Sequence, residues 1–156
     1  MIRLTRAHAN DAEALTALSI RAFENDIHYG AAEAGGPPGY DSVDWQRRTI
    51  AGADYYTIRE DETLIGGLII GPGSSGQHEL WRIFLAPERQ NRGIGSRVLA
   101  LIWAQYPLAS AWVVDTPPWN ERTRHFYQRN GFCEAGLTPE GTIRLVRNCP
   151  PPRPVL

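Results

Sequence analysis

Hydrophobic positions along the chain follow two kinds of spacing, one typical of strands and one typical of helices. Residues 2–5 alternate apolar and polar side chains, which predicts a short first strand. Asn10 then provides an N-cap, with Glu13 as its capping-box partner, for a helix that extends to about residue 25. The apolar stripe of this helix consists of Ala14, Leu15, Leu18 and Ala22. A strand followed by a helix begins an α/β pattern.

Residues 26–41 form a long irregular segment before the pattern resumes. The segment contains Gly-Gly-Pro-Pro-Gly, and connections of this length are uncommon in compact domains unless they are functional or disordered. Ser42 then caps a second helix over residues 43–51, which Gly52 ends. Apolar runs predict a three-strand meander with turns at 61–62 and 72–76. Its strands cover residues 55–59, 63–70 and 78–85.

The second half begins with the last of these strands, a glycine-containing turn and a helix. Pro87 cannot donate a backbone hydrogen bond, so the strand is expected to end near residue 86. Residues 90–95 form the turn, and a helix to about residue 105 follows. Its apolar face consists of Ile94, Val98, Leu101 and Ile102. This helix is the crossover to a parallel strand at residues 111–114.

The remaining elements are one helix and one hairpin. Asn120 caps a helix over residues 121–129, and Gly131 fits its C′ position. The inner face of this helix carries Thr123, Phe126 and Tyr127. The final hairpin pairs residues 132–137 with 142–147. The whole pattern predicts a single α/β domain over residues 1–148, followed by an extended proline-rich tail over 149–156.

Composition and charge exclude several classes of function. Seventeen acidic and 16 basic residues give a formal net charge of −1, which argues against a nucleic-acid or membrane partner. No apolar run approaches the length of a membrane span, and the N-terminus does not resemble a signal peptide. The cysteines, Cys133 and Cys149, suit a reduced cytoplasmic protein and lack the spacing of a zinc site, so no metal is expected. We expect Cys133 to pack in its strand.

The turn at residues 90–95 is the strongest local signal for ligand binding. A helix that begins directly after glycines presents unpaired backbone N–H groups and the positive end of its dipole, which suits a phosphate. Two common phosphate motifs do not fit. A dinucleotide fingerprint needs a third glycine where this chain has Val98, and a P-loop needs a lysine, which the chain lacks altogether.

The turn Gln90-Asn91-Arg92-Gly93-Ile94-Gly95 resembles the Q/R-x-x-G-x-G/A pyrophosphate loop of the GCN5-related N-acetyltransferase (GNAT) family. Asn120, followed seven residues later by Tyr127 and then by Gly131 and Phe132, resembles a second signature of that family. Together the two cover about residues 78–133. The resemblance implies a twisted mixed sheet of about six to seven strands, splayed between the fourth and fifth strands and flanked by about four helices. It also implies acetyl-CoA as co-substrate.

Site residues follow from this resemblance position by position. The strand residues Ile83, Phe84 and Leu85 would pair with the pantetheine arm like an added strand. The turn would hold the pyrophosphate, because glycine permits close approach and unusual dihedral angles. The implied cofactor-binding set is completed by Gln90, Asn91, Arg92, Gly93, Ile94, Gly95, Ser96, Asn120 and Tyr127. Tyr127 also matches the family's general acid, although a purely packing role beside Phe126 is the alternative.

The general base is open between two carboxylates and water. Glu79 lies eleven residues before Gln90, as catalytic glutamates do in several family members. Asp115 precedes Asn120 at the end of the fifth strand, where other members carry an acidic residue. Both are expected to face the splayed cleft. His78 and His125 are weaker candidates, because their positions suit ordinary surface histidines.

The acceptor is the least constrained part of the prediction. Acidic residues outnumber basic ones around the region that, by resemblance, walls the acceptor site, which favours a cationic small-molecule amine. The acidic residues are Glu24, Asp26, Glu33, Asp41, Asp44, Asp54, Glu60, Asp61 and Glu62. Acetylation of a peptide or protein, a CoA-binding module without turnover, and acetylation of aminoacyl-tRNA are the alternatives. Dimers are frequent in the family, which allows a homodimer, but the sequence does not fix the oligomeric state. Trp119 is expected near the acceptor.

Overall fold

The structure is a computed structural model and describes residues 1–148. In these residues, one seven-stranded sheet has the order β1-β2-β3-β4-β5-β7-β6. The strands are β1 (Ile2–Arg6), β2 (Asp54–Glu60), β3 (Thr63–Ser74), β4 (Gln77–Leu85), β5 (Ala111–Thr116), β6 (Cys133–Leu137) and β7 (Ile143–Asn148). The helices are α1 (Ala12–Glu24), α2 (Val43–Gly52), α3 (Ile94–Gln105) and α4 (Glu121–Arg129). Short 3₁₀ turns are η1 (Ala9–Asp11), η2 (Asn25–Tyr29) and η3 (Pro87–Arg89).

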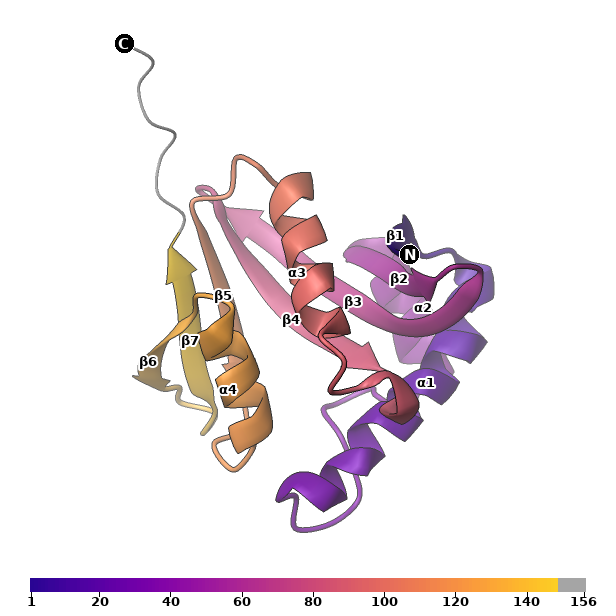
Figure 1. The fold of residues 1–156 in the computed structure, drawn as a ribbon, viewed down its shortest axis with the longest axis horizontal. Coiled ribbons are helices and arrows are strands. Elements are labelled where there is room, and N and C mark those ends of the chain that lie inside the picture. The colour runs from indigo at the N-terminus through magenta and orange to yellow at the C-terminus, as the bar shows by residue number, and fades with distance from the viewer. Residues whose placement is uncertain (149–156) are drawn as a thin grey trace.

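The sheet opens between β4 and β5. All strand pairs are antiparallel except β4 with β5, which pair in parallel only from Gln77 to Glu79. Beyond Glu79 the two strands diverge, and Figure 1 shows them close at their beginnings and far apart at their ends. The predicted mixed sheet, its splay and its four flanking helices are therefore confirmed.

A β-bulge in β4 lies directly beyond the point where pairing with β5 stops. Ile70 of β3 is opposite Leu80, but the preceding Ile69 is opposite Arg82, so Trp81 is an extra residue in β4. Since side chains alternate along a strand, one extra residue exchanges the faces of everything after it. Leu80 therefore shares the α3 face of the sheet with Ile83, whereas Arg82 lies on the opposite face.

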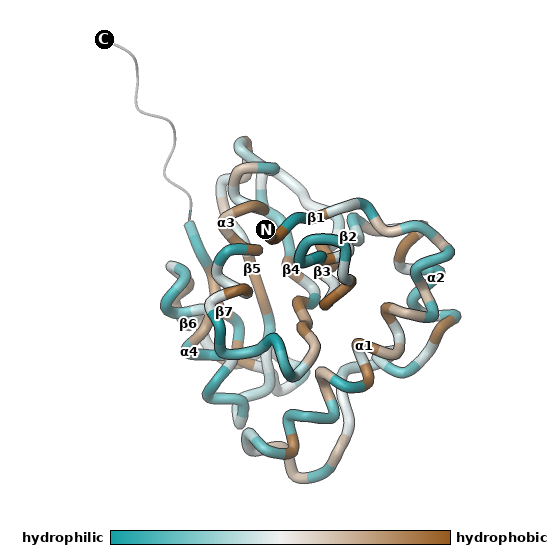
Figure 2. Tube along the Cα trace, turned by 45° about the vertical axis from the view of Figure 1, so that its right-hand side comes forward, coloured by the Kyte–Doolittle hydropathy of each residue, from teal (hydrophilic) through white to brown (hydrophobic). Residues whose placement is uncertain are grey.

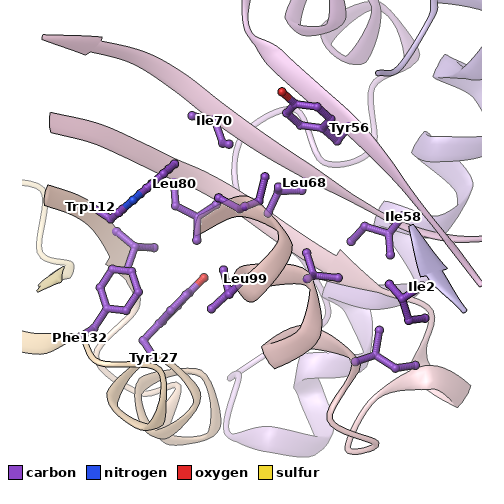
Figure 3. Packing of buried hydrophobic residues seen from close by; sticks show 14 of the residues in the cluster. Ile2, Tyr56, Ile58, Leu68, Ile70, Leu80, Leu99, Trp112, Tyr127 and Phe132 are labelled. Atoms are coloured by element: carbon purple, nitrogen blue, oxygen red, sulfur yellow. The ribbon is translucent and has the colours of Figure 1, made fainter. Parts of the chain in front are cut away.

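Two hydrophobic clusters pack the two faces of the sheet. The larger cluster joins α3, α4 and the sheet and includes Leu80, Leu99, Trp112, Tyr127 and Phe132 (Figure 3). The smaller cluster joins α1, β2, β3 and β4 on the other face, around Leu15, Tyr55, Ile69 and Phe84. Figure 2 shows hydrophobic residues, in brown, concentrated in central strands such as β5. The sheet is thus covered by helices on both faces.

Several local predictions are wrong. Asn10 is not the N-cap of α1, because a 3₁₀ turn precedes the helix and the Asp11 carboxylate accepts a hydrogen bond of 2.8 Å from the His8 N–H. Ala14 is exposed, and the buried stripe of α1 consists of Ala12, Leu15, Thr16, Ser19 and Ala22. Cys133 is exposed instead of packed, because every residue of β6 is exposed.

Two expectations concern the ends of the domain and its environment. The predicted proline-rich tail, 149–156, lies outside the described residues. Among residues 1–148, no helix is both long enough and apolar enough to cross a lipid bilayer.

Candidate active site

A cavity of about 680 Å³ occupies the opening between β4 and β5. One wall is the second half of β4 with the turn that leads into α3, and the opposite wall is the end of β5 with α4. The irregular segment 31–37 and the end of α1 supply a third wall. Beyond Glu79 the β4 edge that faces β5 has no strand partner in the described chain, so its backbone groups are available to a ligand.

The turn before α3 lines this cavity in an unusual backbone conformation. Gly93 is the N-cap of α3 with φ of 75°, and Asn91 also has a positive φ of 61°. No heavy atom lies within 4 Å of the position where a Cβ on Gly93 would be, so its conformation, not crowding, requires glycine there. The first N–H groups of α3 have no partners within the helix and lie in the cavity wall. This arrangement suits an anion with several oxygens.

Gly95 is required for a different reason. A Cβ on Gly95 would lie 2.8 Å from Cε1 of Phe126, which is closer than side chains approach. Close packing of α3 on α4 therefore needs a residue without a side chain at this position. A hydrogen bond of 3.1 Å from Asn130 Nδ2 to Ser96 Oγ adds a polar contact between the same two helices.

Asn120 caps α4 and also lines the cavity. Its side chain accepts a hydrogen bond of 3.1 Å from the Thr123 N–H and so caps α4. The residue is buried and lines the cavity. The cap therefore fixes the start of α4, and with it the position of Tyr127 two turns later.

Tyr127 is buried in the wall of the cavity. Its ring contacts the rings of Phe126 and Phe132, at centroid distances of 5.1 and 5.3 Å, and its hydroxyl points away from α4 (Figure 3). The hydroxyl makes no hydrogen bond with any residue in 1–148. Burial raises the pKa of Tyr127 above its usual value, so the hydroxyl is protonated at neutral pH.

The two candidate bases lie in different surroundings. Asp115 lines the cavity and accepts two hydrogen bonds, 2.9 and 3.0 Å long, from Nε and Nη2 of Arg144. Glu79 does not line this cavity, because β4 and β5 are still paired at its position. It lines a neighbouring cavity of about 240 Å³ and accepts a hydrogen bond of 3.0 Å from Trp81 Nε1. The expectation that both carboxylates face the main cleft is therefore wrong for Glu79.

The two cavities share one wall. Both are lined by Pro37, Trp81, Arg82 and Asp115. The end of β4 (Ile83, Phe84 and Leu85) lines only the large cavity, whereas the earlier residues Glu79 and Leu80 line only the small one. The turn at Gly93 and the Glu79 carboxylate thus lie in two adjacent cavities, on either side of this shared wall.

An ion pair across the opening of the sheet was not anticipated from the sequence. Arg122 of α4 donates two hydrogen bonds, one of 3.0 Å to the Asp26 carboxylate and one of 2.7 Å to the side-chain oxygen of Gln90. Its guanidinium carbon lies 3.6 Å from the ring centroid of Tyr29. Burial raises the pKa of Asp26 above its usual value, although the nearby Arg122 opposes this effect. These contacts tie the segment after α1 to α4, on the far side of the opening.

The expected acidic wall is largely absent from the cavity. Of the nine acidic residues from Glu24 to Glu62, only Asp26 and Glu33 line it. Others form ion pairs elsewhere, such as Asp54 with Arg6 and Glu62 with Arg3. The charges around the site are therefore mixed in sign.

Most residues expected to contact the cofactor line the large cavity. The exception is Arg92, which is exposed outside it. Trp119 lines the cavity, and its carbonyl oxygen would be 3.3 Å from a Cβ on Gly30 in the facing segment. Sequence reasoning missed Arg82 and Arg122. It marked the long segment 26–41 as unusual and placed its region in the acceptor wall, whereas residues 31–37 of it line the large cavity. In residues 1–148 no three His, Cys, Asp or Glu side chains cluster as a metal site.

Known structures with this fold are numerous and distant in sequence. The PaiA N-acetyltransferase of Thermoplasma acidophilum, in complex with coenzyme A, is 18% identical with a TM-score of 0.77, over 96% of this chain and 99% of its own. AAC(6')-Ib, in complex with ribostamycin and coenzyme A, is 20% identical with a TM-score of 0.72, over 94% and 93%. The ribosomal-protein-S18-alanine N-acetyltransferase of Escherichia coli is 15% identical with a TM-score of 0.68, over 95% and 94%.

The family follows from comparing the sequence with models of known protein families. No curated protein sequence matches this chain. The model of the acetyltransferase (GNAT) family, in contrast, matches residues 15–132, which include the glycine turn, Asn120 and Tyr127. The chain therefore belongs to the GNAT acetyltransferase family, and it is an acyltransferase whose donor is acetyl-CoA.

Proposed function

We propose that this enzyme transfers the acetyl group to a primary amine of a small molecule. The observation that carries the proposal is the pair of adjacent cavities, of which the large one contains the anion-binding turn and the small one the Glu79 and Asp115 carboxylates. A donor with its pyrophosphate at the turn has its reactive end farther along β4, near the wall that both cavities share. The small cavity beyond that wall then receives the acceptor.

The large cavity fits the donor in three respects. Its N–H groups at the start of α3 and the left-handed Gly93 suit a pyrophosphate. The unpaired edge of β4 at Ile83, Phe84 and Leu85 suits the amides of the pantetheine arm, which would pair like an added strand. We assign cofactor binding to these residues and to Gln90, Asn91, Ile94, Gly95, Ser96, Asn120 and Tyr127, and leave out Arg92.

The transfer requires one proton acceptor and one proton donor. It forms a C–N bond to the amine and breaks the C–S bond of the thioester, so one proton leaves nitrogen and one reaches sulfur. Glu79 accepts the proton from nitrogen in this proposal, because its carboxylate forms no ion pair in the described residues. Asp115 is the alternative, although Arg144 already holds both of its oxygens. Tyr127 supplies the proton to sulfur, since its buried hydroxyl is protonated and has no other partner.

A peptide or protein terminus is the second candidate acceptor. The same fold serves the S18-alanine N-acetyltransferase of Escherichia coli, so the fold alone does not select small molecules. The small cavity favours them, because its volume of about 240 Å³ accommodates little more than one residue-sized group. AAC(6')-Ib, whose structure contains ribostamycin, has the same fold with a small-molecule ligand.

Release of free CoA thiol tests the proposal. The purified chain is incubated with acetyl-CoA and a panel that contains amino acids, polyamines, aminoglycosides and peptides with free N-termini. Turnover with at least one small amine, and a lower kcat/KM for peptides, is the expected result. Turnover with peptides alone would reject the small-molecule proposal. Tight CoA binding without thiol release for any amine would instead favour a non-catalytic CoA-binding module.

Two further expectations remain proposals about the whole protein. We propose a cytoplasmic enzyme that forms a homodimer. Size-exclusion chromatography with light scattering tests the dimer, and a mass of one chain of 17.4 kDa would reject it.

A further inference from the structure

The bulge at Trp81 brings two opposite charges into the wall of the small cavity. Without the extra residue, Glu79 and Arg82 would lie on opposite faces of β4, since they are three positions apart. With it, both lie on the face that carries α2. There, both line the cavity of about 240 Å³ together with Trp45, Trp81, Asp115 and Arg144.

Two of the four charges in this cavity neutralise each other. Asp115 and Arg144 form the two-hydrogen-bond pair described above, and that contact raises the pKa of Arg144. Glu79 and Arg82 have no ion pair with any residue of 1–148. The cavity therefore offers one carboxylate and one guanidinium without a direct ion pair, and the Glu79 charge also interacts at longer range with Arg144.

Arg82 is held in place without a counter-ion. Its guanidinium lies 4.1 Å from the ring centroid of Trp45, and Nη2 donates to the carbonyl oxygen of Pro38. Nη1 is buried and has no hydrogen-bond partner in the described chain. Burial lowers the pKa of Arg82 to about 10, and only Tyr55 acts in the opposite direction. A buried guanidinium with an unused donor is costly unless an anion completes it.

We propose that the acceptor is an amino carboxylic acid, whose ammonium group pairs with Glu79 and whose carboxylate pairs with Arg82. This inference rests on the proposed transfer to a small amine and names the class of that amine. The ligand carboxylate replaces the Pro38 carbonyl at the guanidinium and uses the free Nη1. A carboxylate is the stronger acceptor of the two, because hydrogen bonds between ions are stronger than those to neutral groups.

The same arrangement disfavours acceptors without an anionic group. A polyamine or an aminoglycoside would bring its additional ammonium groups toward Arg82, where like charges repel. The ammonium that pairs with Glu79 must lose one proton before it attacks the thioester. Glu79 takes this proton and releases it to solvent, so that the carboxylate can accept the second proton, which nitrogen loses as the amide forms. Binding and deprotonation therefore use the same contact.

Matched acceptors test the inference on the unmodified enzyme. Each amino acid in a panel is compared with its amide and with the amine that lacks the carboxyl group, at saturating acetyl-CoA. We expect kcat/KM for the best amino acid to exceed that of both counterparts by about 10- to 100-fold, the effect of one charge-assisted hydrogen bond. Quenching of tryptophan fluorescence, with Trp45 and Trp81 in the cavity wall, measures binding of the same compounds independently of turnover.

A substitution assigns the preference to Arg82. In Arg82→Gln the discrimination between amino acid and amine is expected to disappear, mainly through a rise in KM for the amino acid. The readout is the ratio of kcat/KM for the amino acid to kcat/KM for the amine without a carboxyl group, which should fall toward one. Arg48→Gln, an exposed α2 position that lines neither cavity, is the matched control and should retain the discrimination.

The outcomes separate this inference from the proposed function. Equal use of amino acids, amides and amines by the unmodified enzyme would overturn the inference while the small-amine function stands. A preference that survives in a folded Arg82→Gln would overturn the role of Arg82. If Arg82→Gln does not fold, the comparison of amino acids with their amides and amines on the unmodified enzyme still tests the preference for a carboxylate. Absence of thiol release with every amine would reject the proposed function, and fluorescence titration would then show whether amino acids bind at all.

Discussion

Gly95 and Phe126 approach each other so closely that a Cβ on Gly95 would lie 2.8 Å from Phe126 Cε1. We predict that Gly95→Ala destabilises the enzyme by about 1–3 kcal/mol, because the methyl group overpacks this contact. In a Phe126→Leu background the sign should reverse, since the ring atoms are gone and alanine favours a helix over glycine by about 1 kcal/mol. Urea denaturation of the unmodified enzyme, the two single variants and the double variant measures the effect. A double variant whose loss of unfolding free energy equals the sum of the two single losses would contradict a packing role for Gly95.

Gly93 should respond differently, because backbone conformation and not packing requires glycine there. With φ of 75°, Gly93→Ala is expected to cost about 1–2 kcal/mol and to weaken CoA binding as the turn changes shape. Gly93→Asn should lose less, since asparagine tolerates the left-handed region. The matched control is Gly141→Ala, where φ is 86° and the space for a Cβ is also open. Calorimetry should find unchanged CoA affinity in that control; an equal loss in both would contradict the assigned turn.

The parts of the site that depend on short-range sequence were predictable. The turn at 90–95, the cap at Asn120 and the helix that carries Tyr127 each depend on neighbours within a few residues, and all are present in the structure. The boundaries of α2, α3 and α4 were predicted to within one residue for the same reason.

The remainder depends on contacts between distant segments. Arg122 and Asp26 are 96 residues apart, and no periodicity in either segment indicates that they meet. The bulge at Trp81 depends on its register with β3, which the β4 sequence alone does not reveal. Glu79 was placed on the correct strand but in the wrong cavity, because the sequence does not reveal that β4 and β5 are still paired at its position.

Asp54 makes the fold sensitive to acid. Burial acts to raise its pKa, but hydrogen bonds from Arg6 and Tyr106 outweigh this and leave the pKa below the ordinary value of an aspartate. The ionised carboxylate therefore stabilises the fold above about pH 4, and that stabilisation disappears as the pH falls through the lowered folded-state pKa. We therefore predict that Asp54→Asn lowers the free energy of unfolding at pH 6 and lowers it less at pH 3. In urea denaturation, Asp41→Asn, an exposed position without an ion pair in residues 1–148, should show no such difference.

Tyr127→Phe should separate catalysis from stability. The hydroxyl has no hydrogen bond to lose within the described chain, so the free energy of unfolding and the CoA affinity should change little. Turnover should fall about 10²- to 10⁴-fold, because the thiolate loses its proton donor. Tyr55→Phe provides the opposite control. It removes a buried hydrogen bond of 2.5 Å to Gln46 and should cost about 1 kcal/mol of stability while turnover is retained. Wild-type turnover in Tyr127→Phe would remove this residue from the mechanism.

The choice between Glu79 and Asp115 depends on which carboxylate is free to accept a proton. Arg144 donates to both oxygens of Asp115, whereas Glu79 receives only the Trp81 indole N–H. We predict that Glu79→Gln lowers kcat about 10²- to 10⁴-fold with unchanged CoA affinity, and that Asp115→Asn lowers it about tenfold or less. Stopped-flow measurement of thiol release on single turnovers checks both. A larger loss in Asp115→Asn would make Asp115 the base, and nearly full activity in both variants would leave water as the proton acceptor.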